Sequence, residues 1–349
     1  NERTIEWNKE GSTRNSLSEN ASWSSNLQWT NTATYTKRFG IHNLTAVVGT
    51  EALDQDYGRD ISASRYDYTF PDNQNTWIIG NGATADLSNG GGQGSHTSMF
   101  GYFGRVDYSF DDKYLATVTV RRDASSKFGE KNRWGTFPSI SLGWRISDEA
   151  FMNNAQWLDD LKLRAGYGTT GNSNIGSYNW AFQFATGTSY HYAIDGSNNS
   201  AYTGYGVSTL GDPNAKWETT RMLNIGFDAT AFQKKLTIGF DYYIKKTTDM
   251  LVAANWSAQA GSASKPRVNI GDMQNNGVDF NIGWNGKVNK FSYGVSANVS
   301  HYKNEVIKLG GSDLIVNLSP RLGNVTKTTE GQPIGMFIGY EVLGIYQDE

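Results

Sequence analysis

The chain has no cysteine among its 349 residues and only six prolines. Without cysteine there is no disulfide framework, no thiolate metal site and no cysteine nucleophile. No apolar run reaches the roughly 18 residues of a membrane helix, which excludes a helical membrane protein but not one that crosses with strands. The formal charge of -3 is small and Lys and Arg are scattered, so we expect no nucleic-acid partner.

Polar side chains that could carry chemistry also lack the spacing of a catalytic or metal site. The four histidines lie far apart in the sequence: His42, His96, His191 and His301. None belongs to a ligand motif, so we interpret them as loop or interface residues. Asp54, Asp56 and Asp60 lack the glycine and terminal glutamate of an EF-hand, which favours a solvated loop over a calcium site. We therefore expect no enzyme activity and no cofactor.

Aromatic residues and glycine are abundant, with 11 Trp, 19 Tyr, 16 Phe and 39 Gly. In about ten segments, large apolar residues alternate with small or charged ones. Residues 291–299 are an example, with Phe, Tyr, Val, Ala and Val at odd positions and Ser, Gly, Ser and Asn at even ones. Because successive side chains of a strand point to opposite faces, this pattern predicts a sheet with one apolar and one wet face.

The spacing of these segments predicts where strands and connections lie. We expect strands in the ranges 18–37, 44–52, 99–110, 114–123, 137–147, 161–167, 223–229, 238–244, 278–284 and 291–299. Short turns are predicted at 38–42, 111–113, 148–160, 233–235 and 285–289, the last one through Asn285-Gly286. Longer loops are predicted at 57–97, 171–216 and 249–270.

Short turns and long loops alternate along the chain, as in a β-barrel that crosses an outer membrane. Strands of about ten residues exceed the usual soluble strand and match the length that crosses hydrocarbon at a tilt. A soluble antiparallel sandwich also alternates faces and is the alternative. Against it, charges recur on the polar face, and aromatic residues lie near strand ends, as in the girdles of a membrane barrel. Those charges are Glu51, Arg105, Asp107, Arg145, Lys162, Arg164, Asp228, Asp241 and Asp279.

Several blocks of the sequence resemble the SusC/RagA-type TonB-dependent transporters of the Bacteroidetes outer membrane. The blocks are 101–108 (Gly-Tyr-Phe-Gly-Arg-Val-Asp-Tyr), 121–129 (Arg-Arg-Asp-Ala-Ser-Ser-Lys-Phe-Gly), 132–139 (Asn-Arg-Trp-Gly-Thr-Phe-Pro-Ser), 161–168 (Leu-Lys-Leu-Arg-Ala-Gly-Tyr-Gly), 216–220 (Lys-Trp-Glu-Thr-Thr), 271–279 (Gly-Asp-Met-Gln-Asn-Asn-Gly-Val-Asp) and 331–335 (Gly-Gln-Pro-Ile-Gly). We interpret them as architecture rather than chemistry. The glycines let strands meet bulky neighbours, Trp134 and Phe137 suit an interfacial belt, and Trp217 begins a strand.

The resemblance implies an all-β fold, part of an antiparallel transmembrane barrel of about 22 strands. It implies that residues 1–349 form a partial barrel domain of about ten strands, with the plug and N-terminal domains outside the chain, and that this part alone does not close a barrel. It also implies active import of a large glycan or peptide across the outer membrane of a Gram-negative bacterium, with TonB and a SusD-type surface lipoprotein as partners. A passive porin and a soluble carbohydrate-binding β protein are the rival functions.

Aromatic residues in the long loops are candidates for contact with substrate or partner. Exposed rings can stack on sugars or grip peptides, and they can equally pack against one another or against the lipoprotein. The candidates are Trp77, Trp180, Tyr190, Tyr192, Tyr202 and Tyr205.

Overall fold

Almost all regular structure in the chain is β-strand. The computed structural model describes residues 2–6, 14–68, 73–83, 88–93, 96–186, 192–193, 201–253, 263–310, 314–319, 323–339, 341 and 344. No helix in these ranges is long and apolar enough to span a bilayer. The described strands of twelve residues or more number ten: β2 (Ser16–Phe39), β3 (His42–Tyr66), β5 (Thr97–Phe110), β6 (Tyr114–Ser125), β7 (Trp134–Arg145), β8 (Leu158–Asn172), β13 (Glu218–Ala231), β14 (Leu236–Ala253), β15 (Arg267–Val288) and β16 (Phe291–Lys308).

Short elements occupy the connections between the long strands. The short strands are β1 (Glu2–Glu6), β4 (Ser88–Gln93), β9 (Gln183–Thr186), β10 (Tyr192–Ala193), β11 (Ala201–Tyr202), β12 (Tyr205–Thr209), β17 (Leu314–Ser319), β18 (Gly323–Thr328) and β19 (Met336–Phe337). The 3₁₀ helices are η1 (Gln74–Thr76), η2 (Ile79–Asn81), η4 (Glu130–Asn132), η5 (Ile146–Asp148) and η6 (Ala150–Met152). The ten long strands and the all-β class confirm the prediction from alternation.

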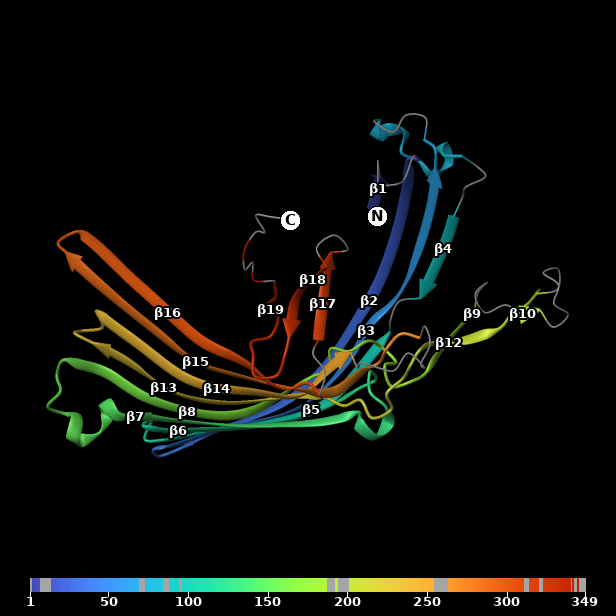
Figure 1. Cartoon of the computed structure of the whole chain (residues 1–349). Helices are drawn as coiled ribbons and strands as arrows, with labels where there is room; N and C mark the ends of the chain where they lie inside the picture. The colour runs from blue at the N-terminus through green and yellow to red at the C-terminus, as the bar shows by residue number, and fades with distance from the viewer. Residues whose placement is uncertain are drawn as a thin grey trace. The chain divides into compact units, whose positions relative to one another are not determined.

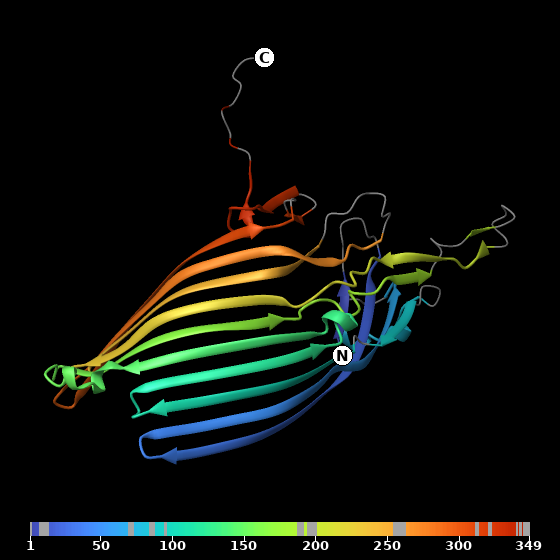
Figure 2. The same ribbon diagram turned by 90° about the horizontal axis from the view of Figure 1, so that it is seen from below.

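Hydrogen bonds link the strands in the order β1-β2-β3-β5-β6-β7-β8-β13-β14-β15-β16, and β4 pairs with β3. Chain neighbours are therefore sheet neighbours, as in an antiparallel meander. By contacts the chain divides into a smaller unit, residues 1–30 and 51–100, and a larger unit, residues 31–50 and 101–349. In the larger unit the long strands lie side by side in one curved sheet, with the short hairpin turns together at one end (Figures 1 and 2).

In the smaller unit, hydrogen bonds join the residues just before β2 to the residues just after β3. Arg14 donates to Asp67 through Nε (3.0 Å), and Asn15 pairs its amide with both backbone groups of Tyr68 (3.1 Å from Nδ2 and 2.6 Å to Oδ1). Leu17 and Tyr68 are buried at this point. Because one asparagine satisfies both the donor and the acceptor of one residue, it acts like an additional strand partner.

The turn positions agree with the sequence in most hairpins. Asp111 and Asp112 have φ near 52° in the β5–β6 turn, and Gln233 and Lys234 have φ of 62° and 63° in the β13–β14 turn. Positive φ at consecutive residues produces the tight reversal that a two-stranded hairpin needs. The predicted turn at Gly40 is also present, with φ of 63°.

Four predicted connections are wrong in their bounds. The loop predicted at 249–270 is too long at both ends, because β14 continues to Ala253 and β15 begins at Arg267. β3 continues to Tyr66, so the predicted loop from residue 57 begins ten residues too early, and β4 pairs within it. The loop 171–216 contains the paired strands β9 and β12. Asn285 and Gly286 do not form a turn, because they pair in register with Gly294 and Tyr293, and the β15–β16 turn lies at Asn289 with φ of 55°. A strong local turn signal was overridden by continued strand pairing.

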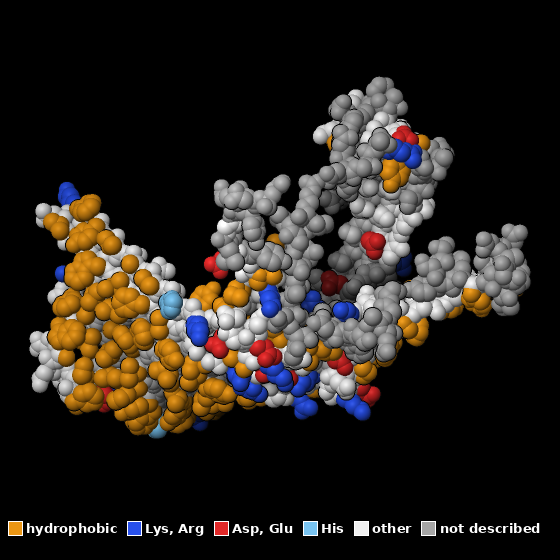
Figure 3. Space-filling view, viewed as in Figure 1, with side chains coloured by type: hydrophobic (Ala, Val, Ile, Leu, Met, Phe, Trp, Pro, Cys, Tyr) orange, Lys and Arg blue, Asp and Glu red, His pale blue; other side chains and the backbone are white. Residues whose placement is uncertain are grey.

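The two faces of the larger unit's sheet differ as the alternation predicts. Register places Phe227 beside Phe240, Phe240 beside Phe280 and Phe280 beside Val299, so apolar residues of four strands share one row. Many of them are exposed in this chain, such as Ile225 at 51% and Val295 at 68%. Figure 3 shows hydrophobic side chains covering the hairpin-turn half of the sheet. An exposed apolar face of this extent is the signature of a surface covered by lipid or by a partner.

Candidate functional site on the polar face of the sheet

An arginine clasp across three strands is the main charged feature of the polar face. Arg164 on β8 donates through Nε (2.7 Å) and Nη2 (3.0 Å) to Asp228 on β13. The same guanidinium donates through Nη1 (3.0 Å) and Nη2 (3.1 Å) to Asp241 on β14. Both contacts are bidentate, the geometry in which a planar guanidinium binds a carboxylate most strongly. The clasp therefore ties three strands together while leaving their polar side wet.

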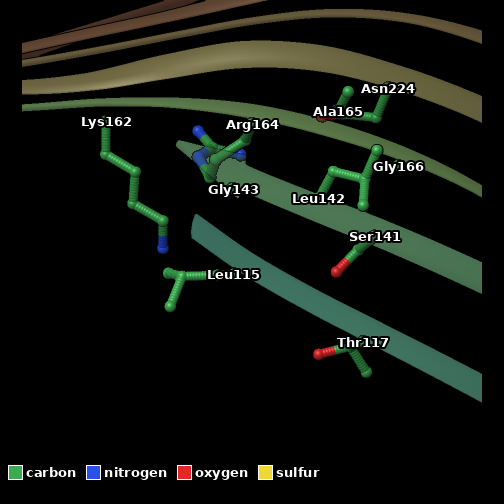
Figure 4. Close-up of a pocket in the computed structure, with 10 residues that line it drawn as sticks. All are labelled: Leu115, Thr117, Ser141, Leu142, Gly143, Lys162, Arg164, Ala165, Gly166 and Asn224. Atoms are coloured by element: carbon green, nitrogen blue, oxygen red, sulfur yellow. The ribbon is translucent and has the colours of Figure 1, made fainter. Parts of the chain in front are cut away.

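A shallow pocket of about 310 Å³ lies beside this clasp on β6, β7, β8 and β13. Figure 4 shows the ammonium of Lys162 and the hydroxyls of Ser141 and Thr117 facing the same space. The space exists partly because Gly143 and Gly166 have no side chains there. Hydroxyl, amide and ammonium groups can exchange hydrogen bonds with a polar solute, so the pocket suits passage or weak binding of polar molecules.

A second ion pair lies on the same face. Arg105 donates to Asp107 two residues along β5 (2.8 Å from Nε), and Thr117 on β6 donates to the same carboxylate (2.7 Å). No group of three or more potential metal ligands exists among the described residues. Five of the predicted charges of the polar face, Arg105, Asp107, Arg164, Asp228 and Asp241, are thus neutralised by one another on the strands themselves.

The hallmark blocks meet in a buried aromatic cluster. Trp217 lies 5.2 Å from Phe128 and 5.4 Å from Phe137 between ring centroids, and its indole N–H donates to the carbonyl of Arg133 (2.9 Å). All three rings are at most 9% exposed. Residues about 90 positions apart in the sequence therefore close the ends of β6, β7 and β13 together. The interpretation of these blocks as architecture is confirmed for this cluster.

The structure contradicts the predicted interfacial belt at Phe137 and leaves it as a prediction at Trp134. Phe137 is not in the belt, because its ring is buried against Trp217 and lies where a Cβ on Gly135 or Gly171 would be. Trp134 is 42% exposed and stacks on Tyr102, with centroids 6.0 Å apart and planes at 12°. As aromatic residues the two look alike in the sequence, and only tertiary packing distinguishes them.

The hairpin-turn end carries two runs of neighbouring aromatic rings, which together we call the belt. Neighbouring rings lie 5.0 to 6.5 Å apart, in the pairs Phe39–His42, His42–Phe110, Phe110–Tyr114, Tyr114–Trp144, Trp157–Phe232 and Phe232–Trp284. Sequence reasoning predicted girdles at the strand ends but assigned no role to His42 within one. The only signal available for that was its position two residues after the Gly40 turn.

Glu149 fastens this belt from the η5–η6 connection. Its Oε1 accepts hydrogen bonds from the hydroxyl of Tyr114 (2.6 Å) and the indole of Trp144 (3.1 Å). The two bonds hold the pKa of Glu149 below its ordinary value, the Tyr114 bond having the larger effect.

In the smaller unit, hydrogen bonds from His96 and then Ser98 likewise lower the pKa of Asp54. Asp54 is thus engaged by side chains of its own unit.

The candidate contact residues lie at several places. Trp77 follows η1 in the smaller unit. In the larger unit Tyr192 and Tyr202 stack across β10 and β11 with centroids 6.1 Å apart, and Tyr205 on β12 is 75% exposed. Trp180 is half-buried beside Gly129, and its indole nitrogen is buried without a partner among the described residues. Tyr190 and His191 lie outside the described residues. The structure therefore groups Tyr192, Tyr202 and Tyr205 on one projecting segment, which we call the finger (β9 to β12).

Known proteins share this architecture. The family described as TonB dependent receptor-like, beta-barrel matches residues 2–337. TonB-dependent receptor P3 of Formosa agariphila is 32% identical over 96% of this chain, and TonB-dependent receptor SusC of Bacteroides thetaiotaomicron is 34% identical over 72%. A structure of the RagAB peptide transporter superposes with a TM-score of 0.79 and 29% identity, over 94% of this chain and 35% of that one.

The chain spans about a third or less of the length of these curated relatives, 32% of receptor P3 and 25% of SusC. The matched region nevertheless includes every long strand of the sheet and all of its hallmark cluster. With a family match over nearly the whole chain and a receptor 32% identical across it, the chain belongs to the TonB-dependent receptor β-barrel family of the Gram-negative outer membrane, in its SusC/RagA-type branch.

Proposed function

We propose that the full-length protein imports a large nutrient, a glycan or a peptide, by TonB-dependent transport, and that this chain forms part of the barrel wall. One observation carries the proposal: the sheet has an apolar row exposed on one face and paired charges on the other. A wall with lipid on one side and water on the other requires this segregation. A soluble sandwich would bury the apolar face instead.

The exposed rings of the finger support the proposal that the protein binds a partner at the cell surface. Tyr192, Tyr202 and Tyr205 present exposed rings on short paired strands, away from the hydrocarbon-facing rows. Rings that are rigid and amphipathic are the residues most often used as anchors in protein interfaces. We therefore assign the finger to contact with a SusD-type lipoprotein or with the cargo. The RagAB structure is described as that of a peptide transporter, which supports the peptide class. The glycan class comes from the resemblance of the sequence blocks to SusC/RagA-type transporters, and both classes stay in the proposal.

The transport proposal is tested with the full-length protein in cells that depend on it for growth on a candidate glycan or peptide. Uptake of the labelled nutrient should require TonB, and a strain that lacks TonB should fall to background. Uptake that persists without TonB would indicate a passive porin and overturn active transport. Glycan and peptide are supplied in parallel, so the same assay identifies the cargo class.

The finger is tested by the double substitution Tyr202→Ser and Tyr205→Ser in the full-length protein. We expect several-fold less lipoprotein to co-purify, since two exposed rings are lost from one segment. Tyr302→Ser is the matched control, because Tyr302 is similarly exposed (63%) but lies on β16. Unchanged lipoprotein recovery and unchanged uptake in the double variant would remove the finger from the proposal.

A further inference from the structure

Basic residues follow the apolar residues in the lipid-facing rows of three strands, β6, β13 and β14. On β13 the apolar row is Ala229, Phe227, Ile225 and Leu223, and the next residue in that row is Arg221. On β14 the row Ile238, Phe240, Tyr242 and Ile244 is followed by Lys246. The pairing of β13 with β14 runs without a register shift from Thr219 to Ala231, so the alternation holds over this whole stretch.

Arg221 and Lys246 are directly opposite each other across the two strands. Both are exposed, and neither forms an ion pair with any described residue. Like charges directly opposite in an antiparallel pair repel and destabilise the sheet. A single long basic side chain can extend along the apolar surface to reach water. Two such side chains that are neighbours on one face still repel each other unless an anion lies between them.

The distance of Arg221 and Lys246 from the hairpin-turn end of their strands corresponds to the thickness of the hydrocarbon layer, which places the pair at a membrane interface. Arg221 is ten positions from Ala231 at the hairpin-turn end of β13, and Lys246 is ten positions from Leu236 on β14. A tilted strand crosses the hydrocarbon in about 9 to 11 residues. Short turns of such barrels face the periplasm, so the opposite interface is the outer leaflet.

A third basic residue follows the apolar row of β6. Arg122 follows Val118 and Val120 in the lipid-facing row, and its guanidinium lies 5.1 Å from the Trp134 ring centroid. Trp134 stacks on Tyr102. Exposed Trp and Tyr rings concentrate where headgroups begin. On β6 as well, a basic residue and exposed aromatic rings follow the apolar row, which is the combination expected at headgroup level.

We propose that Arg221 and Lys246 form a binding site for the phosphate of a phosphorylated glycolipid in the outer leaflet. The guanidinium can donate two hydrogen bonds to one phosphate, and the ammonium adds a point charge beside it. The phosphate removes the repulsion between the two side chains, while the acyl chains of the same lipid cover the apolar row below. The site depends on the orientation of the barrel in the membrane and not on which nutrient is transported.

The test uses the purified full-length protein in detergent and three probes: bisphosphorylated lipid A, chemically dephosphorylated lipid A, and inorganic phosphate. Bisphosphorylated lipid A should raise the Tm of the wild type. The double variant Arg221→Gln and Lys246→Gln should lose at least half of that shift. Lys245→Gln is the control for position, because it removes one positive charge one residue away from Lys246 on the opposite face of β14.

The outcomes separate the alternatives. A full shift retained by the double variant, or an equal loss in Lys245→Gln, would overturn the site. An equal shift with dephosphorylated lipid A would mean that only acyl chains matter. A shift with inorganic phosphate as large as that with the lipid would mean a free-anion site, and the glycolipid assignment would be wrong. None of these measurements depends on transport, so failure of the proposed import would leave the result unchanged.

Discussion

At the scale of single residues, the polar face is stabilised by charges that neutralise one another across strands. The Arg164 side chain is 30% exposed, and its partners Asp228 and Asp241 are 52% and 23% exposed. This partial exposure places the clasp between a surface pair, which contributes little, and a buried pair, which is costly to break. Because the clasp is bidentate, we expect it to contribute more to the stability of the fold than an ordinary surface ion pair.

We expect Arg164→Gln to lower the free energy of unfolding by about 1–2 kcal/mol, because two carboxylates then lose their common partner. The measurement is urea unfolding of the full-length protein in vesicles. Arg105→Gln is the control, since its pair with Asp107 lies within one strand and is more exposed, and it should cost about 0–1 kcal/mol. Equal losses in the two variants would show that bridging three strands adds nothing.

We expect Glu149 to make the hairpin-turn end sensitive to acid. Its pKa in the folded protein is lowered by Tyr114 and Trp144, so its contribution to stability is present above the unfolded value of about 4.3 and is lost as the pH falls through the folded pKa. We expect the wild-type urea midpoint to fall more steeply below about pH 4.3 than that of Glu149→Gln. Parallel pH profiles of the two proteins would contradict this role for Glu149.

At the scale of elements, the hallmark cluster depends on glycine where strands approach a ring. A Cβ on Gly171 would lie 2.0 Å from Phe137 Cζ, and that ring is already held by Trp217. We expect Gly171→Ala to destabilise the protein by about 1–3 kcal/mol through overpacking, measured by urea unfolding. Gly166→Ala on the same strand meets nothing closer than 3.9 Å and should be nearly neutral. A neutral Gly171→Ala would mean that the cluster can open without cost.

The hairpins show how far local signals reach. Asp111-Asp112 and Gln233-Lys234 are turns both by sequence and by their positive φ. Asn285-Gly286 is the stronger sequence signal but lies inside paired strands, and a Cβ on Gly286 would meet the Tyr293 ring at 2.2 Å. The glycine is needed for that cross-strand ring rather than for a turn. The difference arises from pairing with β16, which no local window contains.

At the scale of the whole molecule, neighbouring residues of one strand should meet different solvents. We expect Ile225→Cys in the full-length barrel to resist a water-soluble maleimide, because lipid covers the exposed apolar row. Asn224→Cys, one residue away, lines the polar pocket and should react once the lumen is accessible to the reagent. Labelling yields by mass spectrometry check this. Reaction of Ile225→Cys with protection of Asn224→Cys would mean that the apolar face is an interior.

The site was partly predictable from sequence. The parity of Arg164, Asp228 and Asp241 placed them on the wet face, since side-chain alternation is a property of each strand by itself. Their union in one clasp was not predictable, because it requires the relative register of β8, β13 and β14. The candidate rings Tyr192, Tyr202 and Tyr205 were found from composition, whereas their grouping on paired strands came from the fold.

The sequence by itself determined the all-β class, the positions of the ten long strands and the two faces of the sheet. These follow from period-two alternation and turn residues, which act over a few neighbours. Only the tertiary structure decided the extension of β3, the burial of Phe137 against Trp217 and the direct opposition of Arg221 and Lys246. Each of these depends on how far two strands stay paired and in which register. Pairing is a cooperative property of segments distant in the chain, and no single segment encodes it.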